Sequence, residues 1–276
     1  MIVWIDGELL PLERARVSPL DHGLTVGDGV FETLRTYRGV PFAWRRHLER
    51  LRASAAALGL DVPDGDELRL AADAVLRANR LGDARVRITV TGGPAPPGSS
   101  RAPGAGPTTI VVAAPLAPGA PTADVVIAPW TRNEHGALAG LKTISYAANV
   151  RALAYAQARG AQEAIFANTA GNLCEATGSN VFLVLDGVLV TPPPSAGCLQ
   201  GVTRALLLEL CDGTCEERDV PIGALATADE AFLSSTTREV QPIAHVDGVA
   251  LPAAPGPVAT RLAAAFAQLV ARDLDP

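Results

Sequence analysis

Lysine is almost absent from this sequence. Of its 23 basic residues, 22 are arginines and one is a lysine, Lys142. Arginine can replace lysine in most surface roles, but its guanidinium stays protonated in proteins, whereas an amine shielded from water can become a nucleophile and form an imine. Lys142 is therefore the first candidate for chemistry, and the alternative is that it survives by chance in a loop.

The chain also lacks an excess of basic charge and long apolar runs. With a net charge of -6 and a pI of about 5.3, it has no broad attraction to nucleic-acid phosphates or anionic lipid, and we expect neither partner. No apolar run approaches the roughly 18 residues of a membrane span. Residues 1–6 lack the basic and apolar regions of a signal peptide. We therefore expect a cytoplasmic protein that acts on small molecules.

Metal-ligand and disulfide patterns are missing as well. The four cysteines form no Cys-x-x-Cys pair, and a cytoplasmic compartment keeps thiols reduced, so we interpret them as core or surface residues. The four histidines show no metal-ligand spacing, and no metal site is predicted. These residues are Cys174, Cys198, Cys211 and Cys215, and His22, His47, His135 and His245.

The first part of the chain has the pattern of an α/β domain. Apolar residues at spacings of three and four predict helices, and short apolar runs between Gly turns predict strands. In residues 44–58, for example, Leu48, Leu51 and Leu58 form one apolar stripe and Gly59 marks the end. The pattern predicts hairpin turns at residues 6–7 and 38–39, helices at 44–58 and 66–79, and strands at 85–91 and 108–113.

Two segments are rich in Gly and Pro and are predicted to lie outside the core. Residues 92–107 form a long exposed loop, of a length that is often functional. Residues 115–122 link a first domain, residues 1–114, to a second domain, residues 123–276. In the second domain we predict strands at 124–128, 163–167, 180–185 and 188–191, and helices at 146–159, 202–211 and 258–271.

Five motifs in order, over nearly the whole chain, resemble those of the fold-type IV, or class IV, pyridoxal-phosphate enzymes. This family includes D-amino-acid and branched-chain aminotransferases and aminodeoxychorismate lyase. The resemblance implies two α/β (α+β) domains with pyridoxal 5′-phosphate between them, and a homodimer. The motifs are Asp21-His-Gly-Leu-Thr-Val-Gly-Asp-Gly-Val-Phe-Glu32, Leu141-Lys-Thr, Glu175-Ala-Thr-Gly-Ser-Asn-Val-Phe182, Gly201-Val-Thr-Arg204 and Ser234-Ser-Thr-Thr237.

The resemblance assigns the chemistry of the cofactor ring to three residues. Lys142 would carry the cofactor as a Schiff base. Glu175 would keep the pyridine nitrogen protonated, without which the ring is a poor electron sink. Tyr146 would hydrogen-bond the ring hydroxyl, and a packing tyrosine is the alternative.

The cofactor phosphate needs hydrogen-bond donors, and a helix N-terminus offers free N–H groups with a favourable dipole. Val202 and Thr203 begin such a predicted helix, although an ordinary helix start fits these residues equally well. The resemblance implies a phosphate role for them and adds Arg50, Ser235 and Thr236 as further phosphate contacts.

Phe31 and Arg101 are the candidate substrate-binding residues. The resemblance implies that the long loop, with Arg101, reaches the partner subunit's pocket and meets a substrate carboxylate. D-amino-acid aminotransferases of this family have a tyrosine where Phe31 stands and an Arg-x-His where this chain has Arg101-Ala-Pro103. Two hydrogen-bonding groups of that carboxylate trap are therefore absent. Asp28, between two glycines, is interpreted as part of a structural turn, because a lone Gly-x-Gly is no evidence of nucleotide binding.

We therefore expect an aminotransferase that moves an amino group between an amino acid or primary amine and a 2-keto acid by a ping-pong route through Lys142. The amino acid is expected to be D-configured, with broadened specificity. A lyase that converts 4-amino-4-deoxychorismate into p-aminobenzoate and pyruvate is the main alternative. A non-catalytic cofactor-binding protein is a third possibility, which the presence of both Lys142 and Glu175 opposes.

Overall fold

The computed structural model describes residues 1–211 and 213–276, and the chain divides into two units. The first unit contains Met1–Ala117, Leu141–Tyr146 and Asp273–Pro276, and the second contains Pro118–Gly140 and Ala147–Arg272. The segment that carries Lys142 therefore packs within the first unit. The expected domains, residues 1–114 and 123–276, differ from these units because residues 141–146 and 273–276 pack with the first unit. That the two parts are independent domains stays a prediction.

An antiparallel six-stranded sheet forms the body of the first unit, with the strand order β2-β1-β6-β5-β3-β4. Both predicted hairpins are confirmed: Asp6 and Gly7 (φ 46° and 97°) and Arg38 and Gly39 (φ 55° and 83°) have the positive φ that two-residue hairpin turns favour. The strands are β1 (Ile2–Ile5), β2 (Glu8–Pro11), β3 (Gly29–Tyr37), β4 (Val40–Pro41), β5 (Ala84–Thr91) and β6 (Thr109–Pro115).

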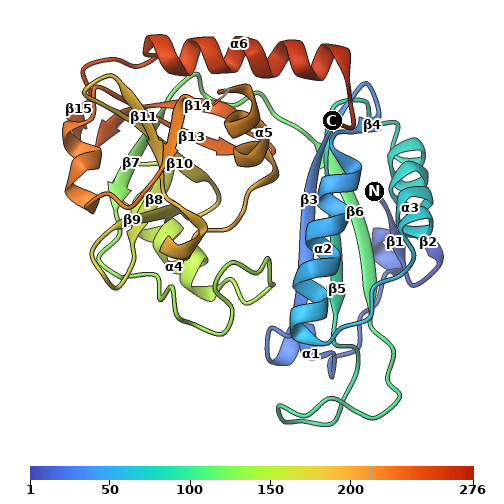
Figure 1. The fold of residues 1–276 in the computed structure, drawn as a ribbon. Helices are drawn as coiled ribbons and strands as arrows, with labels where there is room; N and C mark the ends of the chain where they lie inside the picture. The colour runs from blue at the N-terminus through green and yellow to red at the C-terminus, as the bar shows by residue number, and fades with distance from the viewer. Residues whose placement is uncertain (212) are drawn as a thin grey trace. The chain divides into compact units, whose positions relative to one another are not determined.

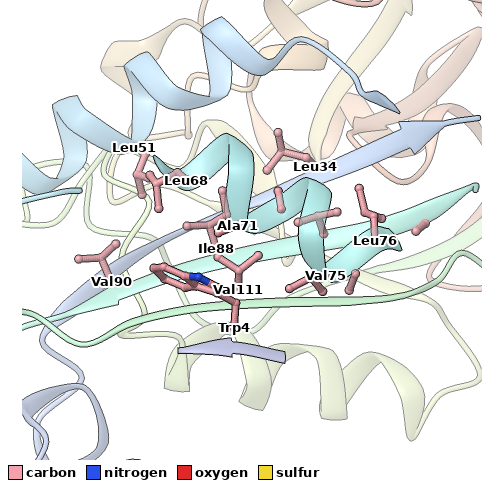
Figure 2. Close-up of a cluster of buried hydrophobic side chains, with 14 of the residues drawn as sticks. Trp4, Leu34, Leu51, Leu68, Ala71, Val75, Leu76, Ile88, Val90 and Val111 are labelled. Carbon is pink, nitrogen blue, oxygen red and sulfur yellow. The ribbon is translucent and has the colours of Figure 1, made fainter. Parts of the chain in front are cut away.

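Helices α2 (Trp44–Leu58) and α3 (Gly65–Ala78) cover one face of this sheet (Figure 1). Leu68 and Val75 of α3 lie over Ile88 and Val111 of the sheet, as Figure 2 shows. These apolar side chains are buried because residues three and seven apart on a helix share a face, while alternate residues of a strand share a face. The two short helices of this unit are η1 (Leu12–Arg14) and α1 (His22–Thr25).

Helix α2 starts without a capping side chain of its own, since Ala43 at the N-cap has no side-chain oxygen to accept a hydrogen bond; its backbone is in the left-handed region (φ 52°). The backbone N–H of Ala43 instead donates to the carbonyl of Leu274 (2.7 Å), and the N–H of Arg45 donates to the carboxylate of Asp275 (3.0 Å). Asp275 thus takes the place of an N-cap side chain at the N–H of Arg45. The helix ends at Gly59 (φ 62°), as predicted.

The second unit is built on a nine-stranded sheet with the order β12-β11-β10-β13-β14-β7-β8-β9, and β15 pairs with β14. Strand β7 pairs in parallel with β8 and β14, as does β11 with β12, and the other pairs are antiparallel. The strands are β7 (Ala123–Ile127), β8 (Glu163–Ala167), β9 (Leu173–Ala176), β10 (Asn180–Leu185), β11 (Val188–Thr191), β12 (Cys215–Glu217), β13 (Glu230–Ser235), β14 (Glu239–Val246) and β15 (Val249–Ala250).

Three helices pack on this sheet: α4 on β8, α5 on β13, and α6 on β13 and β14. Their bounds are α4 (Ala147–Gln157), α5 (Val202–Leu210) and α6 (Pro257–Arg272), and the shorter helices are η2 (Pro194–Ala196) and η3 (Ile222–Thr227). Within the described part of the chain, none of the helices has the length and apolar character that a membrane crossing needs.

The helices and strands predicted from the sequence are confirmed, with ends that agree to within two residues. Five strands were not predicted: β9, β12, β13, β14 and β15. Three of them have four residues or fewer, which is too short to show a period. Strand β14 contains Pro242, and a proline argues against a strand because it has no N–H to donate.

The packing of α3 gives a prediction about stability. Leu68 is fully buried (0% exposed), whereas Leu70 on the same helix is 67% exposed. Leu68→Ala is expected to lower the free energy of unfolding by about 2–5 kcal/mol, because a cavity remains in the core. Leu70→Ala, the matched control, is expected to stay within roughly 0.5 kcal/mol of the parent. Denaturant unfolding measures both, and equal effects would contradict this packing.

Candidate active site

Lys142 is held on a short segment that pairs with the start of β3. The backbone N–H of Phe31 donates to the carbonyl of Lys142 (3.1 Å), and the N–H of Ile144 donates to the carbonyl of Gly29 (2.9 Å). On the other side, the N–H of Lys142 donates to the hydroxyl of Ser54 on α2 (3.1 Å). The backbone at the lysine is therefore fixed by both β3 and α2.

The ring of Phe31 lies among two cationic side chains and a tyrosine. Lys142 Nζ is 4.5 Å from the ring centroid and the guanidinium carbon of Arg87 is 3.8 Å from it, both within the roughly 6 Å of a cation–π interaction. The ring of Tyr146 meets Phe31 edge-on, with the centroids 5.2 Å apart. The structure thus brings together three predicted site residues, Lys142, Phe31 and Tyr146, and adds Arg87.

Arg87 was missed by the sequence analysis. It alternates with Val86 and Ile88 on β5, so it lies on the face of the sheet opposite the helices. The signal that could have identified it is an arginine between two apolar residues of the predicted strand at 85–91. Burial lowers the pKa of its guanidinium, although Tyr146 acts in the opposite direction. Its Nε donates to the hydroxyl of Thr89 (3.2 Å), and among the described residues no carboxylate forms an ion pair with it.

A buried carboxylate organises the neighbouring part of α2. Glu32 on β3 is 1% exposed and accepts two hydrogen bonds from Arg50, at 2.7 and 2.8 Å, and His47 Nδ1 lies 2.7 Å from it. Burial acts to raise the pKa of Glu32, but Arg50 and His47 outweigh it and hold the pKa well below its usual range. Burial lowers the pKa of His47 despite Glu32. Arg50 is thus oriented by Glu32, and its contact with phosphate stays a prediction.

Arg101 binds to its own chain. Its guanidinium donates to both carboxylate oxygens of Asp28, at 2.7 and 2.6 Å, and to the carbonyl of Gly59 at the end of α2 (2.8 Å). The hydrogen bond from Arg101 lowers the pKa of Asp28. This pair fastens the long loop to the first unit and gives Asp28 a structural partner. Binding of a substrate carboxylate by Arg101 stays a prediction, and it would require Arg101 to leave Asp28.

In the second unit, Leu199 and Arg132 contact Glu175 on β9. Its carboxylate accepts a hydrogen bond from the N–H of Leu199 (2.9 Å) and pairs with Arg132 (3.3 Å). Arg132 also lies over the ring of Phe166, 4.4 Å from its centroid. The side-chain amide of Asn180 donates to the carbonyl of Leu199 (2.7 Å). Glu175 and Asn180 together fix the segment that leads into α5.

Helix α5 begins at Val202 with no capping side chain, because its N-cap is Gly201. A Cβ atom at Gly201 would overlap the side chain of Asn180, so this close approach requires glycine. Gly201 has no side chain to accept a hydrogen bond from the first-turn amides of Val202 and Thr203, which keeps the helix N-terminus suited to an anion.

Ser235 lies at the end of β13 and Thr236 in the turn after it. The hydroxyl of Ser235 accepts a hydrogen bond from the N–H of Arg238 (3.3 Å). The predicted site residues therefore form one group in the first unit and one in the second. Residues 1–211 and 213–276 contain no group of three or more His, Cys, Asp or Glu side chains arranged to hold a metal ion.

Comparison with known proteins agrees with this geometry. The model of the family "Amino-transferase class IV" matches residues 29–246. The branched-chain-amino-acid aminotransferase of Escherichia coli K12 is 32% identical over 96% of this chain and 91% of that protein. The D-alanine aminotransferase of Bacillus licheniformis is 32% identical over 94% of this chain and 93% of that protein. The structure of the branched-chain aminotransferase from Thermoproteus uzoniensis superposes with a TM-score of 0.90 at 33% identity, over 98% of this chain and 94% of that one.

The fold, with its two sheets and the helices packed on them, is that of the fold-type IV pyridoxal-phosphate enzymes. The chain belongs to the class IV aminotransferase family. Enzymes of this family use pyridoxal phosphate. The donor set fits that cofactor: it contains a lysine amine, a held carboxylate, an oriented arginine and an uncapped helix N-terminus.

The Glu32 cluster predicts a pH dependence of stability. Because the folded-state pKa of Glu32 lies below its unfolded value of about 4.3, its stabilisation is complete above that pH and is lost as the pH falls below it. Glu32→Gln is expected to lower the free energy of unfolding by about 3–5 kcal/mol at neutral pH, because Arg50 keeps a buried charge without its partner. The deficit should shrink below about pH 4.3.

Unfolding curves between pH 3 and pH 8 measure this difference. Glu216→Gln is the matched control, since Glu216 is 56% exposed and pairs with the exposed Arg218. A deficit of Glu32→Gln that stays constant down to pH 3 would contradict an ionised Glu32 in the folded protein.

Proposed function

We propose that this protein is an aminotransferase that moves the amino group of an apolar, branched-chain type of L-amino acid to a 2-keto acid by a ping-pong route through Lys142. The observation that carries the proposal is the cluster around the ring of Phe31, which the amine of Lys142, the guanidinium of Arg87 and the ring of Tyr146 all contact. When bound, pyridoxal phosphate supplies an aldehyde that takes up the amino group and a ring that accepts electrons.

In this proposal, residues of the first unit hold the cofactor, transfer the proton and bind the substrate. Lys142 holds the cofactor and, once released from it, takes and returns the proton at the substrate Cα. Tyr146 hydrogen-bonds the ring hydroxyl. Phe31 gives the substrate side chain an apolar surface, and Arg87 attracts a carboxylate of the amino acid or keto acid.

The other residues bind the cofactor. Glu175 keeps the pyridine nitrogen protonated, and the contacts of Arg132 and Leu199 hold its carboxylate in one orientation. The donors predicted for the phosphate are Arg50, Val202, Thr203, Ser235 and Thr236.

Branched-chain specificity is supported by the relatives from Escherichia coli and Thermoproteus uzoniensis and by the apolar Phe31. The D-configured substrate expected from the sequence is the second candidate, favoured by the relative from Bacillus licheniformis. Within the structure it has less support, because Arg101 is bound to Asp28 and Phe31 lacks a hydroxyl.

We also propose a cytoplasmic homodimer. Three apolar side chains of one short segment, Leu20, Leu24 and Val26, are 45%, 69% and 46% exposed in the single chain. Burial of such side chains against a second copy would account for their position on the surface.

The role of Lys142 is tested by reduction of the holoprotein with borohydride. Lys142 is the only lysine, so the cofactor should become fixed to one peptide in the parent and to none in Lys142→Arg, whose turnover should fall by orders of magnitude. Arg218→Lys, which adds an exposed lysine, is the matched control and should leave both the labelled peptide and the turnover unchanged. Turnover of Lys142→Arg close to the parent value would remove Lys142 from the mechanism.

The substrate is tested with amino donors given singly to the yellow holoprotein. L-Leucine or L-valine is expected to bleach the aldehyde band and release the matching keto acid, faster than D-alanine. Faster bleaching by D-alanine would favour the second candidate. No bleaching by any donor, with pyruvate released from 4-amino-4-deoxychorismate, would replace the aminotransferase by the lyase.

A further inference from the structure

A second buried carboxylate, Glu163 on β8, has no part in the roles described above. It is 3% exposed and binds the loop that follows Glu175. Its carboxylate accepts hydrogen bonds from the hydroxyl of Thr177, the N–H of Gly178 (3.0 Å) and the hydroxyl of Ser179 (3.2 Å). One carboxylate therefore sets the conformation of three consecutive residues between β9 and β10.

The same carboxylate binds the turn after β13. The guanidinium of Arg238 lies 3.2 Å from the carboxylate of Glu163. The backbone N–H of Arg238 donates to the hydroxyl of Ser235 (3.3 Å). The guanidinium also donates to the side-chain oxygen of Gln241, whose amide group donates to the carbonyl of Ala120 (2.7 Å). Arg238 thus connects the turn that contains Thr236 to Glu163 on one side and to the start of the second unit on the other.

The ion pair of Arg238 and Glu163 is more buried than an ordinary surface ion pair. The side chains of Arg238 and Glu163 are 26% and 5% exposed, whereas those of Arg218 and Glu216 are 46% and 56% exposed. Exposed pairs contribute little, but a charge left buried without its partner is strongly unfavourable. Removal of Arg238 should therefore disturb Glu163 and, through it, the loop at residues 177–179.

We propose that Arg238 is a positioning residue for the cofactor, acting through Glu163. It holds the turn of Ser235 and Thr236 in a fixed relation to the loop that follows Glu175, so that the phosphate contact and the ring contact of the second unit are set together. This inference rests on the proposed function, in which Ser235, Thr236 and Glu175 contact pyridoxal phosphate. Arg238 itself needs no contact with the cofactor.

The experiment compares pyridoxal-phosphate affinity in the full chain with Arg238→Gln, Glu163→Gln and the double variant. Loss of a charge-assisted hydrogen bond is worth about tenfold or more in affinity, so each single variant should raise the Kd at least tenfold. Because the two residues act through one contact, the double variant should weaken binding by much less than the product of the single effects. Arg218→Gln, the matched control, should leave the Kd unchanged.

Hydrogen exchange in the cofactor-free full chain gives a second measurement that does not depend on the cofactor. Arg238→Gln should speed exchange at the amides of residues 177–179 as well as 235–238, and Arg238→Lys should restore part of the protection. Faster exchange confined to residues 235–238 would overturn the proposal, as would multiplicative effects on the Kd or a Kd like that of Arg218→Gln.

The two proposals can fail separately. A parent protein that takes up no pyridoxal phosphate would contradict the proposed function. Hydrogen exchange would still show whether Arg238 and Glu163 couple residues 177–179 to residues 235–238. If Arg238→Gln does not fold, Arg238→Lys takes its place. A raised Kd with faster exchange at residues 177–179 would then support the proposal, and parent values of both would overturn it.

Discussion

The ionised carboxylate of Glu32 is the constraint on which the first unit depends. Removal of a charge from water is so unfavourable that its partners must stay in place, and its side-chain partners His47 and Arg50 lie on α2. They are three residues apart, so they face β3 together and fix the rotation of the helix about its axis. Ser54, four residues further on, then meets the N–H of Lys142. A charge on one strand thereby determines where the lysine lies.

The second unit uses a longer chain of polar contacts for the same purpose. Arg132 pairs with Glu175 and also binds the side chain of Asn149 on α4 (3.2 Å). Asn149 donates to the carbonyl of Thr177 (2.7 Å), and the hydroxyl of Thr177 binds Glu163. Each member contacts the next, so a displacement of one residue disturbs its neighbours. Both units therefore orient their functional groups with residues that are not themselves reactive.

The sequence was sufficient to identify residues and helices that are marked by the residue type itself or by a pattern of near neighbours. Lys142 stood out because no other lysine exists, and α2 was predicted to its last residue because its apolar stripe and Gly59 are local signals. The partners of Arg50 and Arg101 could not be predicted, because Glu32 and Asp28 lie 18 and 73 residues away from them along the chain. Arg87 and Arg132 were missed for a different reason, because a charged residue in a sequence is usually solvated.

The return of the chain to the first unit also concerns the order in which the protein can form during synthesis. The sheet and α2 emerge early, but the strand-like pairing at Lys142 needs residues 141–146, and the N-terminal donors of α2 bind Leu274 and Asp275. The N–H groups of Ala43 and Arg45 therefore have no partners in this segment until almost the whole second unit has left the ribosome. Until then the start of α2 is exposed to water and to chaperones, whereas the lysine segment binds residues that precede it in the chain and can reach its place before the second unit is complete.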